Sequence, residues 1–366
     1  MIGSNRATIG NRVTSNMANR RFADRLQMNF ARKNEAEQMI ISQRRFTRAS
    51  QNPLDAARTL RNRKTMSEVD TYRANLDTAT GIYDVAESNV MQVSAILQRL
   101  HETLIRGAND TYTQDQRDII ALEIDQLAAQ MTSLLNVNVA GRQIFGGSNN
   151  GVIKTDTHNG VAFRIDNNTR TVYYNGVPVN DLNDYRDFPD SRTSFLDVGL
   201  GMRWTDEHTI DPQTAIPVTF NGAQVMGSGM TTSTRRTVVG ETPNYFPDFV
   251  HSNNLIQLTL DSATALRNTS DTGSSALIAV YADLIFESQS FVSQSIARIG
   301  SDQAFLEFNK DRLTNLDYSL KERQNHLEFV DMGEATTRWK MLEMVYNATL
   351  QMSASTVPMS IFNFIR

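Results

Sequence analysis

A seven-residue repeat near the end of the chain constrains its fold more than any other feature. Apolar side chains recur there without a miss, at Ile285, Val292, Ile299, Leu306, Leu313, Leu320 and Leu327. This spacing is typical of a coiled-coil seam. No proline interrupts residues 276–356, so the repeat predicts a helix far longer than the average of about 11 to 12 residues. The positions three residues after each seam residue are mostly polar, which predicts a narrow seam.

The front half of the chain carries a partner pattern. Apolar residues spaced by threes and fours between positions 82 and 104 predict one helix, with Ile96 and Leu100 in its seam. Gly107 indicates its end, and Thr113 with Gln116 three residues later predicts a new helix start. The seam expected for this next helix consists of Ile120, Ile124, Leu127, Met131 and Leu134. We therefore expect two shorter front helices that close one bundle with the long C-terminal helix.

Between these helical parts the sequence changes character. Residues 147–253 lose the helical period and are rich in Gly, Asn, Asp and Thr. Alternation at residues 161–165, a turn at 166–169 and a second run at 171–174 predict a hairpin, and residues 216–220 predict another strand. Asn-Gly pairs at 159/160, 175/176 and 221/222 are typical turn signals. From Asn254 onward a helical pattern returns.

The expected fold is mainly α, with a long antiparallel helical bundle or coiled coil formed by both chain ends and an outer β domain at the tip. We expect an N-terminal assembly helix at residues 1–41 and the N-terminal half of the bundle at residues 42–146. A β-rich outer insertion should follow at residues 147–253. The C-terminal half of the bundle should occupy residues 254–332, and a C-terminal assembly helix residues 333–366.

Composition excludes several classes of protein. The chain has no cysteine, hence no disulfide and no thiolate chemistry, and no apolar run approaches the roughly 18 residues of a membrane helix. Its start lacks the apolar core of a cleaved signal peptide. The net charge of −4 hides a basic start: residues 1–73 hold fifteen Lys and Arg against six acidic residues. An Arg-rich coiled coil that binds nucleic acid is therefore an alternative, although few aromatic residues lie among these arginines.

The search for catalytic or metal-binding residues finds little. The five histidines are isolated in the sequence and show no metal-ligand spacing: His101, His158, His208, His251 and His326. Asp206, Glu207 and His208 are the nearest approach to an acid–base cluster, and they lie in the loop-rich insertion. We expect no enzyme activity, no cofactor and no metal.

The last helical segment has almost no polar face. Apolar residues are dense from Trp339 to Met352, and a helix that is apolar all round is normally buried on all sides. Burial between subunits of an assembly is one interpretation, and a core helix of a globular monomer is the other. Methionines are frequent in this tail, and their flexible side chains adapt to unlike neighbours, although they also fill gaps in ordinary cores.

Motifs at both ends resemble those of the flagellar hook-associated protein 3 or hook-filament junction family, FlgL, which is itself similar to flagellin. Residues 12–17 are similar to the family's opening segment, and residues 42–46 resemble its Ser-Ser-Gly-Lys-Arg-Ile stretch, with Gln43 in place of the glycine. The run from Ser50 to Arg58 resembles Ser-Asp-Asp-Pro-x-x-Ala-Ala-Arg. Residues 138–147 resemble Asn-Gly-Arg-Tyr-Leu-Phe-Gly-Gly, and residues 357–366 resemble the shared Pro-x-x-Leu-Leu-x-x-Leu-Arg ending.

This resemblance implies a structural subunit that joins the flagellar hook to the flagellin filament. It implies export through the flagellar type III apparatus without a cleaved signal, an extracellular location in the flagellum, and terminal helices that fold between subunits on assembly. The implied partners are further copies in a ring or helical layer, a second junction protein, flagellin and an export chaperone, with neither nucleic acid nor membrane among them. A filament-forming flagellin is the alternative within the class. The assembly residues we expect are Val13, Met17, Leu342, Val345, Leu350, Val357, Pro358, Ile361, Phe362, Phe364 and Ile365.

Overall fold

The computed structural model describes residues 6–109, 111–148, 161–189, 192–206, 209–211, 214–239, 242–268 and 274–356. The chain divides into two compact units, one made of residues 1–69 and 314–366 and the other of residues 70–313. The boundary falls within the two longest helices, α2 (Pro53–Gly107) and α6 (Ser274–Glu328), which have 55 residues each. The expectation of a shorter front helix is therefore wrong. The expected mainly α fold with long helices at both chain ends and a β-rich middle is confirmed.

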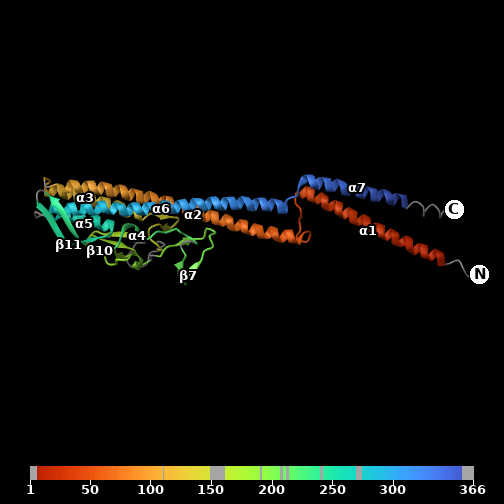
Figure 1. The fold of residues 1–366 in the computed structure, drawn as a ribbon, viewed down its shortest axis with the longest axis horizontal. Helices are drawn as coiled ribbons and strands as arrows, with labels where there is room; N and C mark the ends of the chain where they lie inside the picture. Colours follow the sequence, from red (N-terminus) through yellow and green to blue (C-terminus); the bar gives the residue numbers. More distant parts are fainter. Residues whose placement is uncertain are drawn as a thin grey trace, which may run out of the picture. The chain divides into compact units, whose positions relative to one another are not determined.

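The first unit pairs the two ends of the chain. Helix α1 (Arg6–Ser42) lies beside α7 (Met332–Thr356) in the opposite direction (Figure 1). Asn29 donates a hydrogen bond to Thr349 at 3.1 Å, and the rings of Phe30 and Tyr346 are 5.7 Å apart. The beginning of α2 and the end of α6 complete this unit.

Local chemistry explains where the helices of the first unit begin. Pro53 occupies the first position of α2, where its missing N–H costs nothing, and the Asn52 side chain accepts the Asp55 amide at 3.1 Å. The Asp331 side chain accepts the amides of Gly333 and Glu334 and so caps the start of α7.

The second unit contains a bundle of α2, α3 (Gln114–Leu135), α5 (Leu255–Arg267) and α6, in which side-chain contacts join α2 to α3 and to α6. The Thr113 amide donates to Gln116 Oε1 at 3.0 Å at the start of α3, as the capping pattern predicts. Asn254 caps α5 by accepting the amides of Ile256 and Gln257. A Cβ atom at Gly107 would lie 2.8 Å from Leu266, so this glycine allows the end of α2 to approach α5 closely.

The seam of α2 is itself a seven-residue repeat, which differs in position from the pattern of threes and fours that the sequence predicts for residues 82–104. Its buried residues are Asn62, Val69, Leu76, Tyr83, Val90, Leu97 and Leu104, with Ala79, Ala86, Val93 and Leu100 three residues after four of them. Of the residues predicted for the front seams, Leu100, Ile120, Ile124, Leu127 and Met131 are buried. Ile96 and Leu134 are only half-buried and line one surface hollow between α2 and α3, while their neighbours Leu97 and Leu135 are fully buried.

The seam of α6 follows the predicted repeat for six of its seven members. Ile285, Val292, Ile299, Leu306, Leu313 and Leu320 are buried, whereas Leu327 is half-buried and Glu328 is buried instead. A straight helix drifts about 20° per heptad from a strict repeat, so the buried stripe moves toward the following residue. Near this end of α6, Asp317 and Gln324, which lie four residues after Leu313 and Leu320, are buried. Leu316 and Arg323, which lie three residues after the same leucines, are exposed.

The β-rich part of the second unit consists of small antiparallel pieces. The hairpin of β1 (Asn138–Val139) and β2 (Arg142–Gln143) closes the first helical half. The predicted hairpin is present as β3 (Phe163–Asp166) and β4 (Thr171–Tyr174), and β5 (Val177–Pro178) adds a third strand. β6 (Phe195–Leu196) pairs with β9 (Ile216–Pro217), and β7 (Trp204–Asp206) pairs with β8 (Thr209–Ile210). A longer ribbon, β10 (Met230–Val239) with β11 (Thr242–Ser252), leads into α5.

The turn signals of the insertion have mixed outcomes. Asn175 and Gly176 form the β4–β5 turn with φ values of 48° and 91°, the left-handed conformation that Asn-Gly favours. Asn221 instead caps the short helix α4 (Gly222–Met226), so the expected hairpin turn there is wrong. The pair at 159/160 lies outside the described residues. The strand expected at 216–220 is limited to Ile216–Pro217, and a short 3-10 helix, η1 (Tyr185–Asp187), precedes it in the chain.

Candidate assembly surface

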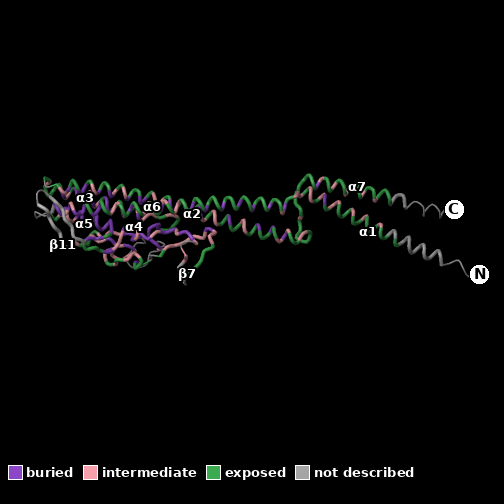
Figure 2. The backbone as a smooth tube through the Cα atoms, viewed as in Figure 1, coloured by how far each residue is buried: buried purple, intermediate pink, exposed green. Residues whose placement is uncertain are grey.

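The pair of α1 and α7 buries almost none of its apolar side chains. Among the hydrophobic residues described in these two helices, only Ala36 and Ala335 are buried. The exposed large apolar residues are Met17, Met28, Phe30, Ile41, Met332, Met341, Met344, Val345, Leu350 and Met352. Figure 2 shows the described part of the pair as mostly exposed, while the helices of the second unit carry buried stretches. We name this pair, with its exposed apolar residues, the terminal pair.

Such a pair gains little free energy from its own contacts. Helical stability in proteins comes mainly from packing an apolar face, at about 25 cal/mol for each Å² of apolar surface removed from water. Two buried alanines remove little apolar surface from water and so supply little of this stabilising free energy. An accumulation of exposed apolar side chains of this kind is typical of an interaction site. The terminal pair is therefore a surface suited to cover by other molecules.

The predicted assembly residues fall partly on this surface. Met17, Val345 and Leu350 are exposed, and Leu342 is half-buried. The side chain of Val13 and the residues Val357, Pro358, Ile361, Phe362, Phe364 and Ile365 lie outside the described part of the chain. The residues most exposed here are Ile41, Met341, Met344 and Met352. The three methionines belong to the apolar tail that the sequence singles out, whereas Ile41 was missed. Their apolar type was visible, but which face of α7 meets α1 was not.

The two linkers that join the terminal pair to α2 and α6 are tied together by backbone hydrogen bonds. The Arg45 amide donates to the Glu328 carbonyl at 2.8 Å, and the Val330 amide donates to the Gln43 carbonyl at 3.1 Å. Gln43 has φ 56°, the left-handed conformation that a residue with a Cβ atom adopts at a cost. This is the position where the hook-associated motif has glycine. These two hydrogen bonds hold the linker that follows α1 against the linker that precedes α7.

A buried carboxylate lies beside this crossing. Glu328 is 5% exposed, and both of its carboxylate oxygens accept hydrogen bonds from the Arg63 guanidinium, at 2.6 and 2.7 Å. Arg44 forms an ion pair with the same carboxylate at 3.2 Å. Gln324 also donates to it. Burial works to raise the pKa of Glu328, but the hydrogen bonds from Arg63 and Gln324 and the arginine charges outweigh it, so the pKa lies below its usual value. Two of the N-terminal arginines therefore have intramolecular roles.

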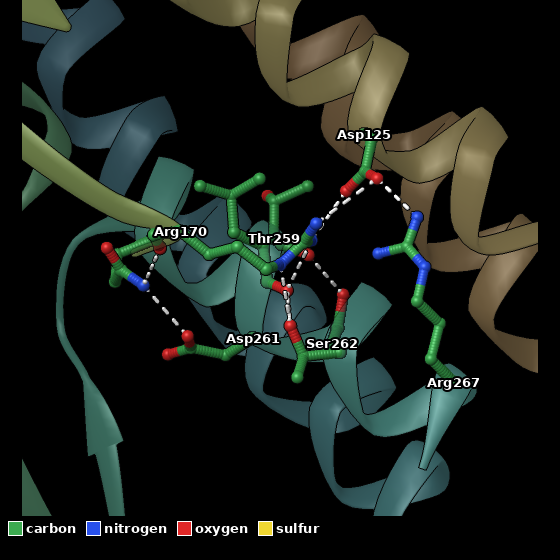
Figure 3. Close-up of polar contacts among 9 residues, drawn as sticks. Asp125, Arg170, Thr259, Asp261, Ser262 and Arg267 are labelled. Atoms are coloured by element: carbon green, nitrogen blue, oxygen red, sulfur yellow. Dashed lines mark hydrogen bonds and ion pairs between the residues drawn. The ribbon is translucent and has the colours of Figure 1, made fainter. Parts of the chain in front are cut away.

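A second ionic cluster, in the other unit, fastens the insertion to the bundle (Figure 3). Asp125 of α3 lies between the guanidinium groups of Arg170, at 2.6 Å, and Arg267 of α5. Arg170, in the β3–β4 turn, also donates to the Leu260 carbonyl and to Thr264. Burial works to raise the pKa of Asp125, but the two arginines outweigh it and hold the pKa below its ordinary value.

Gln257 of α5 adds a second link between insertion and bundle. Its side-chain oxygen accepts the Val172 amide at 2.8 Å, and its side-chain nitrogen donates to the Arg170 carbonyl at 3.0 Å. The glutamine thus satisfies backbone groups at the start of β4, before the residues that pair with β5. Side chains that bond to backbone in this way give the insertion order despite its short strands.

The possible catalytic and metal-binding residues do not converge in the described part of the chain. No group of three or more His, Asp or Glu side chains that could hold a metal ion occurs among the described residues. His101 contacts the Ala282 carbonyl at 3.0 Å, and His251 is buried beside the Phe249 ring. Asp206 belongs to β7, and Glu207 and His208 lie outside the described residues.

One helix in the described part of the chain, Ser275–Glu328 of α6, is long and apolar enough by composition to cross a membrane. Buried core helices meet the same criterion. The seam side chains of this helix are buried against the rest of the protein, which accounts for its composition.

Comparisons with known proteins agree with this architecture. Residues 13–150 match the family model of the bacterial flagellin N-terminal helical region, which comprises α2, α3 and most of α1 in this structure. A comparison with curated protein sequences gives no match. A protein assigned as a flagellar hook-associated protein from Vibrio parahaemolyticus has a similar structure, with a TM-score of 0.52 and 12% identity over 76% of this chain and 100% of the other.

Two further solved structures are more distant. FlgL from Bacillus cereus has a TM-score of 0.47 and 14% identity, over 72% of this chain and 99% of that one. The flagellar junction protein FlgL from Legionella pneumophila has a TM-score of 0.45 and 12% identity, over 75% and 99%. Residues 13–150 thus match the helical region found at the N-terminus of bacterial flagellins. The fold of the chain is similar to that of the Vibrio parahaemolyticus protein.

Proposed function

We propose that the protein is a structural subunit of the bacterial flagellum that joins the hook to the flagellin filament. The observation that carries this proposal is the terminal pair, which joins the two ends of the chain and exposes ten large apolar side chains. A flagellin-type helical region in residues 13–150 and the fold of a hook-associated protein support the same function.

In this proposal the terminal pair packs between subunits. Further copies of the chain form a ring or helical layer, a second junction protein lies on the hook side and flagellin lies on the other. The subunit is exported through the flagellar type III apparatus to the outside of the cell, with an export chaperone covering the C-terminal helix. The protein has no catalytic role, and neither nucleic acid nor membrane is a partner.

Ordering of the terminal pair is coupled to assembly. Fixing a residue's backbone costs about 1 to 2 kcal/mol, and the pair's own contacts bury too little apolar surface to offset this for two helices. Neighbouring subunits supply the missing burial. The six exposed methionines of the pair suit this role, because flexible thioether side chains adapt to neighbours of different sequence.

Deletion of this protein from its own cells tests the proposal. A missing junction subunit should leave hooks without filaments while filament protein is released into the medium. Electron microscopy of the cells and immunoblotting of the medium measure both outcomes. Normal filaments on the deletion strain would contradict the proposal.

A filament-forming flagellin is the second candidate, because the matching family region is that of flagellin itself. The same deletion separates the two functions: loss of a flagellin removes filament protein from the medium as well as from the cell. Purified protein gives an independent check, since long filaments formed by this chain alone would favour the flagellin function.

A further inference from the structure

The two longest helices pack through repeats of identical length. Buried residues recur every seven positions in α2 from Asn62 to Leu104, and in α6 from Ile285 to Leu320. If one helix slides along the other by seven residues, about 10.5 Å at 1.5 Å per residue, apolar residues again face apolar residues. Within this two-helix seam, the apolar side chains alone therefore distinguish the observed alignment only weakly from its neighbours.

Polar contacts at one end of this seam do not repeat. Asn62, one of the buried seam residues of α2, donates to the Leu320 carbonyl at 2.9 Å and to the Gln324 side chain at 3.0 Å. Gln324 in turn donates to Glu328, and Glu328 pairs with Arg63. Asn62, Gln324 and Glu328 are all at least nine-tenths buried, so their polar groups depend on these partners.

A slide by one repeat in either direction breaks this network. In one direction Arg63 moves seven residues back along α6, from Glu328 to Lys321, so that a like charge faces it. In the other direction Arg63 moves past Glu328, which is the last residue of α6, and Asn62 comes to face Leu327. Both alternatives remove Arg63 from Glu328.

We propose that Asn62, Gln324 and Glu328 set the register of α2 against α6. Single buried polar residues fix register and partner choice in coiled coils at some cost in stability, because the misaligned states leave them unpaired. The network acts in the same way here.

Spin labels measure the register directly, and the absence of cysteine from the chain makes their placement unique. Cysteines at Leu60 and Asn315 carry the labels, because both side chains are exposed and lie well apart along the pair of helices. A slide by seven residues changes the distance between the labels by about 10 Å. Pulsed electron paramagnetic resonance on the full chain reports that distance.

The network is removed by replacing Asn62, Gln324 and Glu328 with leucine in one variant. We expect one distance in the parent protein and a second, shifted by about 10 Å, in the variant. The matched control is Asn309→Leu, since Asn309 is equally buried on α6 but donates to the Phe305 carbonyl of its own helix. The control should keep the parent distance.

A milder variant, with Asn62→Leu and Gln324→Leu only, keeps the Glu328–Arg63 pair and covers the case in which the triple variant does not fold. It should also populate the second distance, at a lower fraction. A single unshifted distance in the folded leucine variants would overturn the proposal, as would a shift of the same size in the Asn309 control.

Discussion

The seam of α2 gives the sharpest test of the packing, because two adjacent leucine-sized residues differ in burial. Leu97 is fully buried, while Ile96 faces a surface hollow and is half-buried. Replacing each in turn by alanine removes the same number of carbon atoms. The two variants therefore compare the same chemical change in two environments of one helix.

For Leu97→Ala we expect a loss of about 3 kcal/mol in the free energy of unfolding, from lost apolar burial and the cavity that remains. For Ile96→Ala we expect a loss of about 1 kcal/mol, because the removed atoms are partly in water and because alanine favours helix more than isoleucine does. The difference of about 2 kcal/mol exceeds the usual error of such measurements.

Urea unfolding followed by circular dichroism measures both variants against the parent protein. The Leu97→Ala midpoint should fall clearly below that of Ile96→Ala. If Ile96→Ala is the more destabilised of the two, α2 presents a different face to the bundle and the repeat described here is incorrect.

Three further predictions concern other parts of the structure. Gln43→Gly should stabilise the protein by a few tenths of a kcal/mol or leave its stability unchanged, because relief of the left-handed strain is partly offset by greater freedom in the unfolded chain. Gln43→Val should destabilise the protein, because a β-branched residue adopts this conformation at a higher cost. Thermal unfolding compares the two variants with the parent protein. Asp125→Asn should destabilise the second unit by about 2 kcal/mol at pH 7, because Arg170 and Arg267 lose their shared carboxylate but stay partly solvated. Since the pKa of Asp125 is lower in the folded protein, its contribution is complete above the unfolded value of about 3.9 and is lost as pH falls through the folded pKa, so urea midpoints of variant and parent should converge at low pH. Met344→Glu should leave the monomer's unfolding midpoint unchanged, because the side chain is 70% exposed, yet prevent incorporation into flagella; a variant that incorporates normally would show that this face is not covered.

The sequence was most informative where one residue type fills one position. The repeat of α6 is visible because isoleucine, valine or leucine occupies each seam site. The repeat of α2 contains Asn62 and Tyr83, and alanines fill two of its second positions, so no uniform stripe appears. The apolar Val85 and Ile96 on its half-buried flank then suggested a shifted seam.

The insertion was less predictable because its order depends on long-range side-chain contacts. The Asn136 side chain donates to the Phe163 carbonyl and accepts a hydrogen bond from the Phe163 amide. The Gln257 side chain likewise donates to the Arg170 carbonyl and accepts a hydrogen bond from the Val172 amide. Strands of two to four residues carry too little pattern to be recognised without these contacts. The ionic cluster at Asp125 joins residues 45 and 142 positions apart, which no local spacing indicates.

The exposed terminal pair could be predicted as an assembly segment only in outline. Its density of apolar residues is equally typical of a core helix, and the choice between the two depends on what α1 covers in the folded chain. The structure shows that Ala335 is buried in this pair, that Trp339, Leu342 and Tyr346 are only half-buried, and that the other large apolar side chains of α7 stay exposed.

Hydrogen exchange of the terminal pair tests the central claim most directly. Amides of residues 20–40 and 335–352 should exchange with little protection in the free subunit, because so little apolar surface is buried there, and should become strongly protected in the isolated flagellum. Amides in the seam of α2 and α6 serve as the internal reference and should be protected in both. Strong protection of the terminal pair in the free monomer, or no gain of protection on assembly, would contradict the proposal that neighbouring subunits cover it.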